Sequence, residues 1–165
     1  MRHAVATALL AGFLWAPGAQ AADTCEPGSV DVRSDRSTVR FSVEIADEEP
    51  ERALGLMNRQ ELGRFASMLF IYERPIEAVF WMKNTLIPLD MIFADPTGTV
   101  TRVIANAEPL SLEHRRGGDN VQYVLEINGG LAERLGIGEG AVLRHPQMDQ
   151  AQAAWPCPEA GADAQ

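Results

Sequence analysis

The chain has 165 residues and a formal net charge of −9, with 46% apolar and 7% aromatic residues. This length suits one domain with a single core. An acidic chain is repelled by phosphate backbones, and no basic run offsets the charge, so we expect no nucleic-acid partner.

The first 21 residues have the pattern of a secretory signal sequence. Arg2 supplies a positive start, residues 4–15 form a short apolar run, and Ala19-Gln20-Ala21 is a small-x-small cleavage site. That run is too short to span a bilayer, and no later segment reaches the roughly 18 apolar residues that a span needs. We therefore predict an exported protein, periplasmic or secreted, without a membrane span. An uncleaved amino-terminal anchor is the alternative.

Two cysteines, Cys25 and Cys157, lie near the two ends of the predicted mature chain. In an oxidising compartment such a pair predicts a structural disulfide. Closing so long a loop stabilises the fold by up to about 4 to 5 kcal/mol in the chain-entropy model. The two cysteines are too few and too far apart to form a metal site by themselves.

The first regular elements are a strand and a short helix. Val39, Phe41, Val43 and Ile45 alternate with polar residues, which predicts a strand with one buried face. A short helix follows, with Asp47 as its expected cap and a proline in its first turn.

The remaining elements are mostly strands. The turn Asp95-Pro96-Thr97-Gly98 has the composition of a type I hairpin turn, and a second short helix is expected at residues 131–135. Further strands are expected at 68–72, 78–82, 89–94, 99–105, 121–127 and 141–145. Short strands with two short helices predict a mainly β fold, a compact antiparallel β-sandwich or barrel.

This pattern also divides the chain. We predict a signal peptide at 1–21, an amino-terminal extension at 22–37, a single β-rich domain at 38–146 and a carboxy-terminal tail at 147–165. We find no internal repeat and no second domain.

Motifs for catalysis are missing from the sequence. It has no H-E-x-x-H, no G-x-S-x-G and no P-loop. Asp90 and Glu126 could share acid and base roles in a small hydrolase, which is the alternative function. The methionines Met57, Met68, Met82 and Met91 could bind Cu(I), although flexible core filling is the simpler interpretation. We expect no catalytic residue, no metal and no cofactor.

The segment Trp81-Met82-Lys83-Asn84-Thr85 places polar residues inside apolar sequence, and Asp90 follows it closely. A buried carboxylate needs a partner, and Lys83 and Arg52 are the available cations. Two interpretations remain open. The segment is either a turn anchor or part of a shallow pocket, in which Trp81 is an apolar wall and Lys83, Asn84 and Asp90 contact a small polar ligand.

Several separate blocks resemble one known family. They are Gly55-Leu56-Met57, Met68-Leu69-Phe70, Phe80-Trp81-Met82-Lys83-Asn84-Thr85, Pro88-Leu89-Asp90 and Tyr123-Val124-Leu125-Glu126. The chain resembles domain-of-unknown-function family 192, small bacterial and archaeal proteins that are often exported, from about residue 39 to residue 144. The resemblance implies a β-sandwich of jelly-roll type and no established activity.

The resemblance also carries over Arg52, the Trp81-to-Thr85 segment, Asp90 and Glu126 as motif residues. We therefore predict a non-enzymatic, exported monomer that binds a small polar ligand or a protein. Its candidate site residues are Arg52, Trp81, Lys83, Asn84, Thr85, Asp90 and Glu126.

Overall fold

The computed structural model describes residues 24–158 and contains one mixed β-sheet with two short helices. The predicted signal peptide and the last seven residues of the predicted tail, 159–165, lie outside the described residues. The sheet has seven strands in the order β5-β4-β6-β3-β2-β1-β7. The elements are β1 (Ser29–Arg33), β2 (Thr38–Ala46), α1 (Glu49–Leu54), β3 (Ala66–Phe80), β4 (Leu89–Ala94), β5 (Val100–Ala107), β6 (Arg115–Asn128), α2 (Leu131–Leu135) and β7 (Val142–Arg144).

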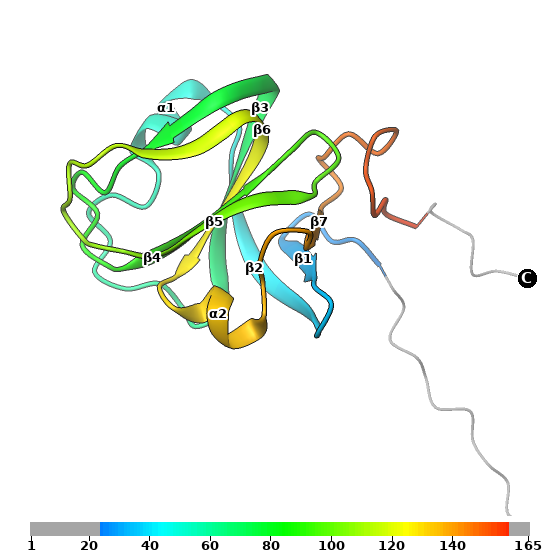
Figure 1. Ribbon diagram of the computed structural model, residues 1–165, viewed down its shortest axis with the longest axis horizontal. Coiled ribbons are helices and arrows are strands. Elements are labelled where there is room, and N and C mark those ends of the chain that lie inside the picture. The colour runs from blue at the N-terminus through cyan, green and yellow to red at the C-terminus, as the bar shows by residue number, and fades with distance from the viewer. Residues whose placement is uncertain (1–23, 159–165) are drawn as a thin grey trace, which may run out of the picture.

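The predicted mainly β class with two short helices is confirmed, but the sheet is a mixed half-barrel rather than the expected antiparallel sandwich or barrel of jelly-roll type. There is a single sheet, which curls into a half-barrel (Figure 1), and β2 and β3 run parallel to each other. The two strands are parallel because α1 and the loop after it return the chain to the end of the sheet at which β2 begins, so β3 runs in the same direction as β2. Period-2 patterning cannot distinguish the two directions, since both give the same alternation of side chains.

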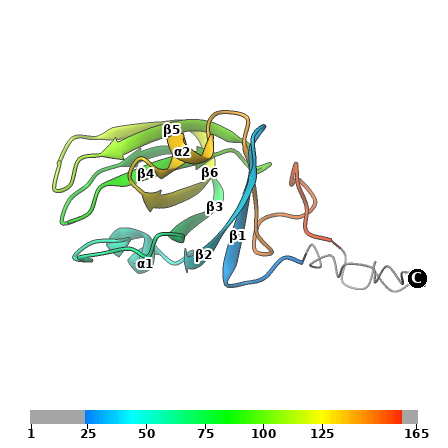
Figure 2. The same ribbon diagram turned by 90° about the horizontal axis from the view of Figure 1, so that it is seen from below.

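One long strand replaces two predicted ones. β3 continues through Glu73-Arg74-Pro75, and its pairing with β6 shifts register between Ile71 and Ile76 and twice more before Val79. Such irregularities bend a strand and increase its twist. The far halves of β3 and β6 therefore form a ribbon, which we call the folded ribbon (76–80 with 115–121), that turns back over one face of the sheet (Figures 1 and 2).

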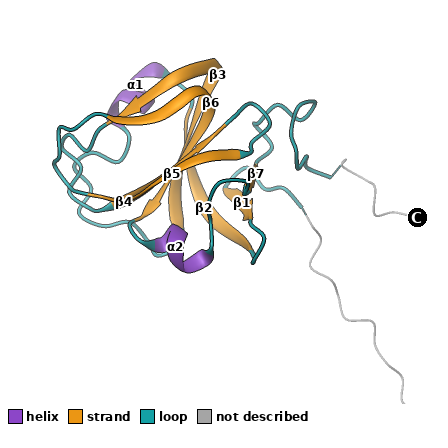
Figure 3. Ribbon diagram, in the orientation of Figure 1, coloured by secondary structure: helices purple, strands orange, loops and turns teal. Residues whose placement is uncertain are grey.

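The two faces of the sheet carry separate apolar cores. One core, which we call the barrel core, takes residues from all seven strands, including Phe41, Leu69 and Leu125, and also contains Leu131 of α2. The other, which we call the outer core, lies on the opposite or outer face of the sheet, beneath the folded ribbon, and contains Phe70 and Phe93. The folded ribbon therefore covers the outer face, as a second sheet would cover it in a β-sandwich (Figure 3).

The helix α1 is stabilised by hydrogen bonds at its ends more than by burial of its side chains. Glu48, not the expected Asp47, is its N-cap, and Glu48 and Glu51 form a reciprocal capping box, with Pro50 in the first turn. None of its residues is buried. The segment that matters for packing is the turn after it, where Leu56 is buried in the outer core.

The two ends of the described chain meet at the β1–β7 edge of the sheet. The predicted disulfide between Cys25 and Cys157 is confirmed, with a sequence separation of 132 residues. Trp155 packs beneath the guanidinium groups of Arg33 and Arg144, at 4.3 and 3.9 Å from its ring centre. Met148, in the predicted tail, is buried in the barrel core, so the start of this segment adds to the core.

A buried ion pair fastens the same edge. Arg40 and Arg144 both contact the Asp31 carboxylate, at 2.7 and 2.8 Å. Burial alone would raise the pKa of Asp31, but the hydrogen bonds from Arg40 and Arg144 outweigh it and hold that pKa below its ordinary value.

Within residues 24–158, no helix is both long enough and apolar enough to cross a lipid bilayer.

The folded ribbon predicts a strict requirement for glycine at position 117. A Cβ added there would lie 2.1 Å from Cδ1 of the buried Phe93 ring. We expect Gly117→Ala to lower the free energy of unfolding by about 1 to 3 kcal/mol through overpacking, measured by urea unfolding. Gly138→Ala is the matched control, because a Cβ there meets nothing within 4 Å. Equal unfolding midpoints for the two variants would contradict this packing.

Candidate functional site

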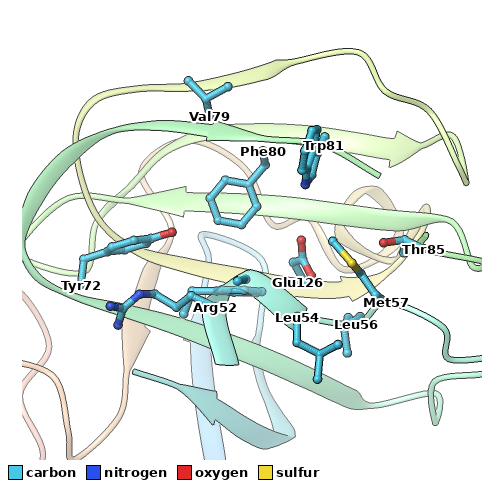
Figure 4. Close-up of a pocket in the computed structure, with 13 residues that line it drawn as sticks. Arg52, Leu54, Leu56, Met57, Tyr72, Val79, Phe80, Trp81, Thr85 and Glu126 are labelled. Carbon is cyan, nitrogen blue, oxygen red and sulfur yellow. The ribbon is translucent and has the colours of Figure 1, made fainter. Parts of the chain in front are cut away.

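A cavity of about 210 Å³ lies on the outer face of the sheet, between α1 and the folded ribbon (Figure 4). The turn after α1 forms one side, the end of β3 forms the other, and a single residue of β6 is at the base. The lining residues are Arg52, Ala53, Leu54, Gly55, Leu56, Met57, Phe70, Tyr72, Val79, Phe80, Trp81, Thr85 and Glu126.

Glu126 is the polar group at the base of this cavity. Its backbone pairs with Met68 of β3 and Met91 of β4, so its side chain leaves the sheet on the outer face. The residue is 5% exposed, and its carboxyl group makes no hydrogen bond or ion pair to any described residue. Burial raises the pKa of Glu126 from its ordinary value of 4.5 to about 8. At neutral pH the Glu126 carboxyl group is therefore mostly protonated.

Arg52 lies at the rim but does not neutralise Glu126. Its Nη1 donates hydrogen bonds to the backbone carbonyls of Asp47 and Ile71, the latter at 3.0 Å. The guanidinium lies 5.1 Å from the centre of the Tyr72 ring, and Figure 4 shows it turned away from Glu126. Tyr72 is itself partly buried, which raises the pKa of its phenol.

Aromatic rings form the upper wall. Phe80 packs edge-to-face against Phe70 and Phe93, with ring centres 5.3 and 5.6 Å apart, and is thereby fixed in place. Trp81 is 43% exposed, and its ring lies 5.0 Å from Lys83 Nζ and 6.1 Å from the His114 ring. Trp81 therefore lies between the cavity and solvent.

The polar segment that follows Trp81 is mostly a turn. The Thr85 amide donates to the Met82 carbonyl, and Asn84 adopts a left-handed backbone with φ of 55°. Lys83 and Asn84 are exposed and do not line the cavity, whereas Thr85 is buried and does. The Leu110 amide donates to the Thr85 carbonyl, which ties this turn to the loop before β6.

Asp90 belongs to a different place in the fold. It is fully buried, but the expected cationic partners Lys83 and Arg52 are wrong. Its carboxylate accepts hydrogen bonds from the backbone amides of Asn106, Gly130 and Ala132, at 2.7 to 2.8 Å. Two of these donors lie at the start of α2, where free amides attract a carboxylate.

Asp90 and Glu126 also lie on opposite faces of the sheet. Asp90 is paired with Ile127, which belongs to the barrel core, while Glu126 lies one residue earlier and faces the outer core. Of the seven predicted site residues, the structure brings together Arg52, Trp81, Thr85 and Glu126 around the cavity. Lys83 does not line the cavity, but its Nζ contacts the ring of Trp81, which does.

Sequence reasoning missed several apolar walls of the pocket, chiefly Met57, Tyr72 and Phe80. A signal for Tyr72 was present, because Met68, Phe70 and Tyr72 alternate along one strand and so share a face. The contribution of Phe80 depends on the fold-back of the ribbon. No three His, Cys, Asp or Glu side chains within residues 24–158 gather where they could hold a metal ion.

Comparison with known proteins gives a family but no activity. Residues 30–145 match the DUF192 family, described as "Uncharacterized ACR". A protein of unknown function from Novosphingobium aromaticivorans DSM 12444 is 42% identical, with a TM-score of 0.68, covering 70% of this chain and 82% of that chain. A putative transcription regulator from Sinorhizobium meliloti 1021 is 34% identical, with a TM-score of 0.69, covering 73% and 94%. No curated protein matches the chain.

Asp90 is expected to be structural. Asp90→Asn replaces one oxygen that accepts backbone amides by an NH2 group, so we expect a loss of about 1 to 3 kcal/mol in the free energy of unfolding. Urea unfolding measures it, with Asp119→Asn, at an exposed position of β6, as the control. A stability equal to that of the control would contradict this role.

Glu126 is expected to make stability depend on pH. Its pKa is higher in the folded chain, about 8, than the ordinary 4.5 of an unfolded chain, so the folded state holds the extra proton between these values. The contribution of Glu126 to stability is therefore greatest below pH 4.5 and falls by up to about 1.4 kcal/mol per pH unit until the pH passes about 8.

Glu126→Gln removes this titration. We expect the variant to gain stability relative to the parent chain as the pH rises from 5 to 8, measured by urea unfolding at several pH values. Parallel stability curves for the two proteins would contradict a buried, protonated Glu126.

Proposed function

We propose that this chain, which belongs to the DUF192 family, is an exported binding module that holds a small ligand in the pocket above Glu126. The proposal is non-enzymatic and needs no cofactor. It also takes the module to act as a monomer.

The state of Glu126 carries this proposal. A carboxyl group that faces a mostly apolar cavity loses hydration and gains no hydrogen bond from the chain, which costs free energy. Its oxygens still reach the cavity, since among residues 24–158 the only fully enclosed side-chain N or O atom without a hydrogen bond is Arg115 Nε. Glu126 is 5% exposed, has no partner among the described residues and points into a cavity. A ligand that supplied the missing hydrogen bonds would recover that cost.

The walls support the same function. Binding sites are mostly apolar and contain a few polar groups that orient the ligand. This cavity has aromatic and aliphatic walls with Glu126 and Thr85 as inner polar groups and Arg52 at the rim. Its volume of about 210 Å³ suits a small molecule rather than a folded partner. Trp81 provides a large contact area at the opening for a small loss of side-chain entropy.

A hydrolase that pairs Asp90 with Glu126 finds no support in the geometry. The two carboxyl groups leave the sheet on opposite faces, and Asp90 is occupied by three backbone amides. They cannot act on one substrate together, because paired carboxylates work from the two sides of the same bond.

Export is proposed from two features. Residues 1–21 have the composition of a signal sequence, and the Cys25–Cys157 disulfide suits an oxidising compartment. The role suggested for the Sinorhizobium protein, transcription regulation, is not carried over. The net charge of −9 opposes contact with DNA.

The proposal predicts a ligand whose affinity depends on Glu126. We expect a thermal-shift screen against metabolites to yield compounds that bind the parent chain and bind Glu126→Leu at least tenfold more weakly, about 1.4 kcal/mol. The variant should itself fold at least as stably, because it removes an unpaired polar group from an apolar site. Isothermal titration measures both affinities.

Two controls make this result specific to the pocket. Glu133→Leu removes an exposed carboxylate on α2 and should leave the affinity unchanged. In a Trp155→Phe background, Trp81 is the only tryptophan of residues 24–158, so its emission should shift with each true ligand. Compounds that bind Glu126→Leu as tightly as the parent chain, or that leave Trp81 emission unchanged, would contradict the proposal.

A further inference from the structure

The cavity also indicates which class of ligand it takes, an inference that rests on the function proposed above. The question is whether Glu126 meets a cation, a neutral group or an anion. Three features of the surrounding residues bear on it: the hydrogen-bonding capacity of the carboxyl group, the rings around it and the charges at the rim.

The carboxyl group offers mostly acceptors. It has two oxygens and at most one proton, and no donor from the described chain reaches either oxygen. An ammonium group carries up to three N–H donors and a positive charge, so it satisfies both oxygens and forms a charge-assisted pair. A neutral alcohol supplies one donor, and an anion supplies none.

The rings are of the kind that bind cations. Trp81, Tyr72 and Phe80 line the cavity, and faces of aromatic rings attract positive charge. Two of these rings already contact cations of the chain itself. Lys83 Nζ lies 5.0 Å from the centre of the Trp81 ring, and the Arg52 guanidinium lies 5.1 Å from the centre of the Tyr72 ring. Most of the remaining wall is apolar, which suits a ligand with a short hydrocarbon body.

The charges of the chain around the cavity also favour a positively charged ligand. The titratable groups that line the cavity with Glu126 are Arg52 on α1 and Tyr72 on β3, and the other lining residues do not ionise. Arg52 is bound to two backbone carbonyls and is turned away from Glu126. The chain as a whole is strongly acidic, with a net charge of −9.

We propose that the pocket binds a compact organic ammonium ion, whose N–H groups contact the Glu126 carboxylate and whose apolar body packs against Trp81, Tyr72 and Phe80. As the cation enters, the Glu126 carboxyl group releases its proton to solvent and becomes the counter-ion. Binding below the pKa of Glu126, about 8, is therefore coupled to the release of about one proton per ligand.

The test compares three ligands of one shape and different charge: n-butylammonium, n-butanol and butyrate. Isothermal titration at about pH 6.5, in buffers of different ionisation enthalpy, gives both the affinity and the number of protons released. We expect butylammonium to bind at least tenfold more tightly than the other two, with close to one proton released. At about pH 9.5, where Glu126 is already ionised, the released proton should disappear.

Two variants assign the effect to its residue. Glu126→Gln, which keeps the shape of the side chain, should weaken butylammonium at least tenfold and abolish proton release. Glu49→Gln, an exposed change on α1, should alter neither by more than about twofold. Circular dichroism and urea unfolding establish that both variants are folded.

The outcomes separate the two proposals. Tighter binding of butanol or butyrate, lost in Glu126→Leu and reported by Trp81 emission, would overturn the ammonium inference and leave the binding function standing. Butylammonium binding without proton release, or unchanged in Glu126→Gln, would overturn the inference as well. If none of the three binds and the metabolite screen is also empty, both proposals fail.

Discussion

The close approach of the folded ribbon to the Phe93 ring is the constraint on which the rest of the outer face depends. The backbone of β6 passes over that ring at Gly117, where even a methyl group would overlap it. This contact lets the irregular β3–β6 pairing turn back over the sheet, and it brings Phe80 and Trp81 above Glu126. The loops beyond the ribbon are then joined by one backbone hydrogen bond, which the Met82 amide donates to the Ser111 carbonyl.

Two carboxylates on neighbouring strands show how one fold assigns opposite roles to similar side chains. Asp90 and Glu126 lie one register step apart, and the alternation of a strand sends them to opposite faces. Asp90 meets the free amides at the start of α2 and is fully hydrogen-bonded there. Glu126 faces a mostly apolar cavity and forms no hydrogen bond with its other polar lining groups, Arg52, Tyr72 and Thr85. The first therefore stabilises the fold, and the second is available to a ligand.

A separate set of contacts stabilises the β1–β7 edge of the sheet. Asp31, its two arginine partners and Trp155 hold β1, β7 and the carboxy-terminal segment together, and the disulfide links the same two ends. These contacts lie at the β1–β7 edge, on the face opposite the barrel core, and share no residue with the pocket lining. The pocket can therefore keep an unpaired polar group, since much of the stability comes from elsewhere.

The sequence by itself determined the family, the mainly β class, the two short helices and the disulfide, because these depend on local periodicity, on separate motif blocks and on an even pair of cysteines. It also led to four of the residues that line the pocket: Arg52, Trp81, Thr85 and Glu126. It did not determine the parallel β2–β3 pair or the continuous β3, since side-chain alternation is blind to strand direction and Pro75 is typical of a strand end. Only the tertiary structure decided that Asp90 is satisfied by distant amides while Glu126 is not. Hydrogen-bond partners 16 to 42 residues away depend on the register between strands, and no local pattern records that register.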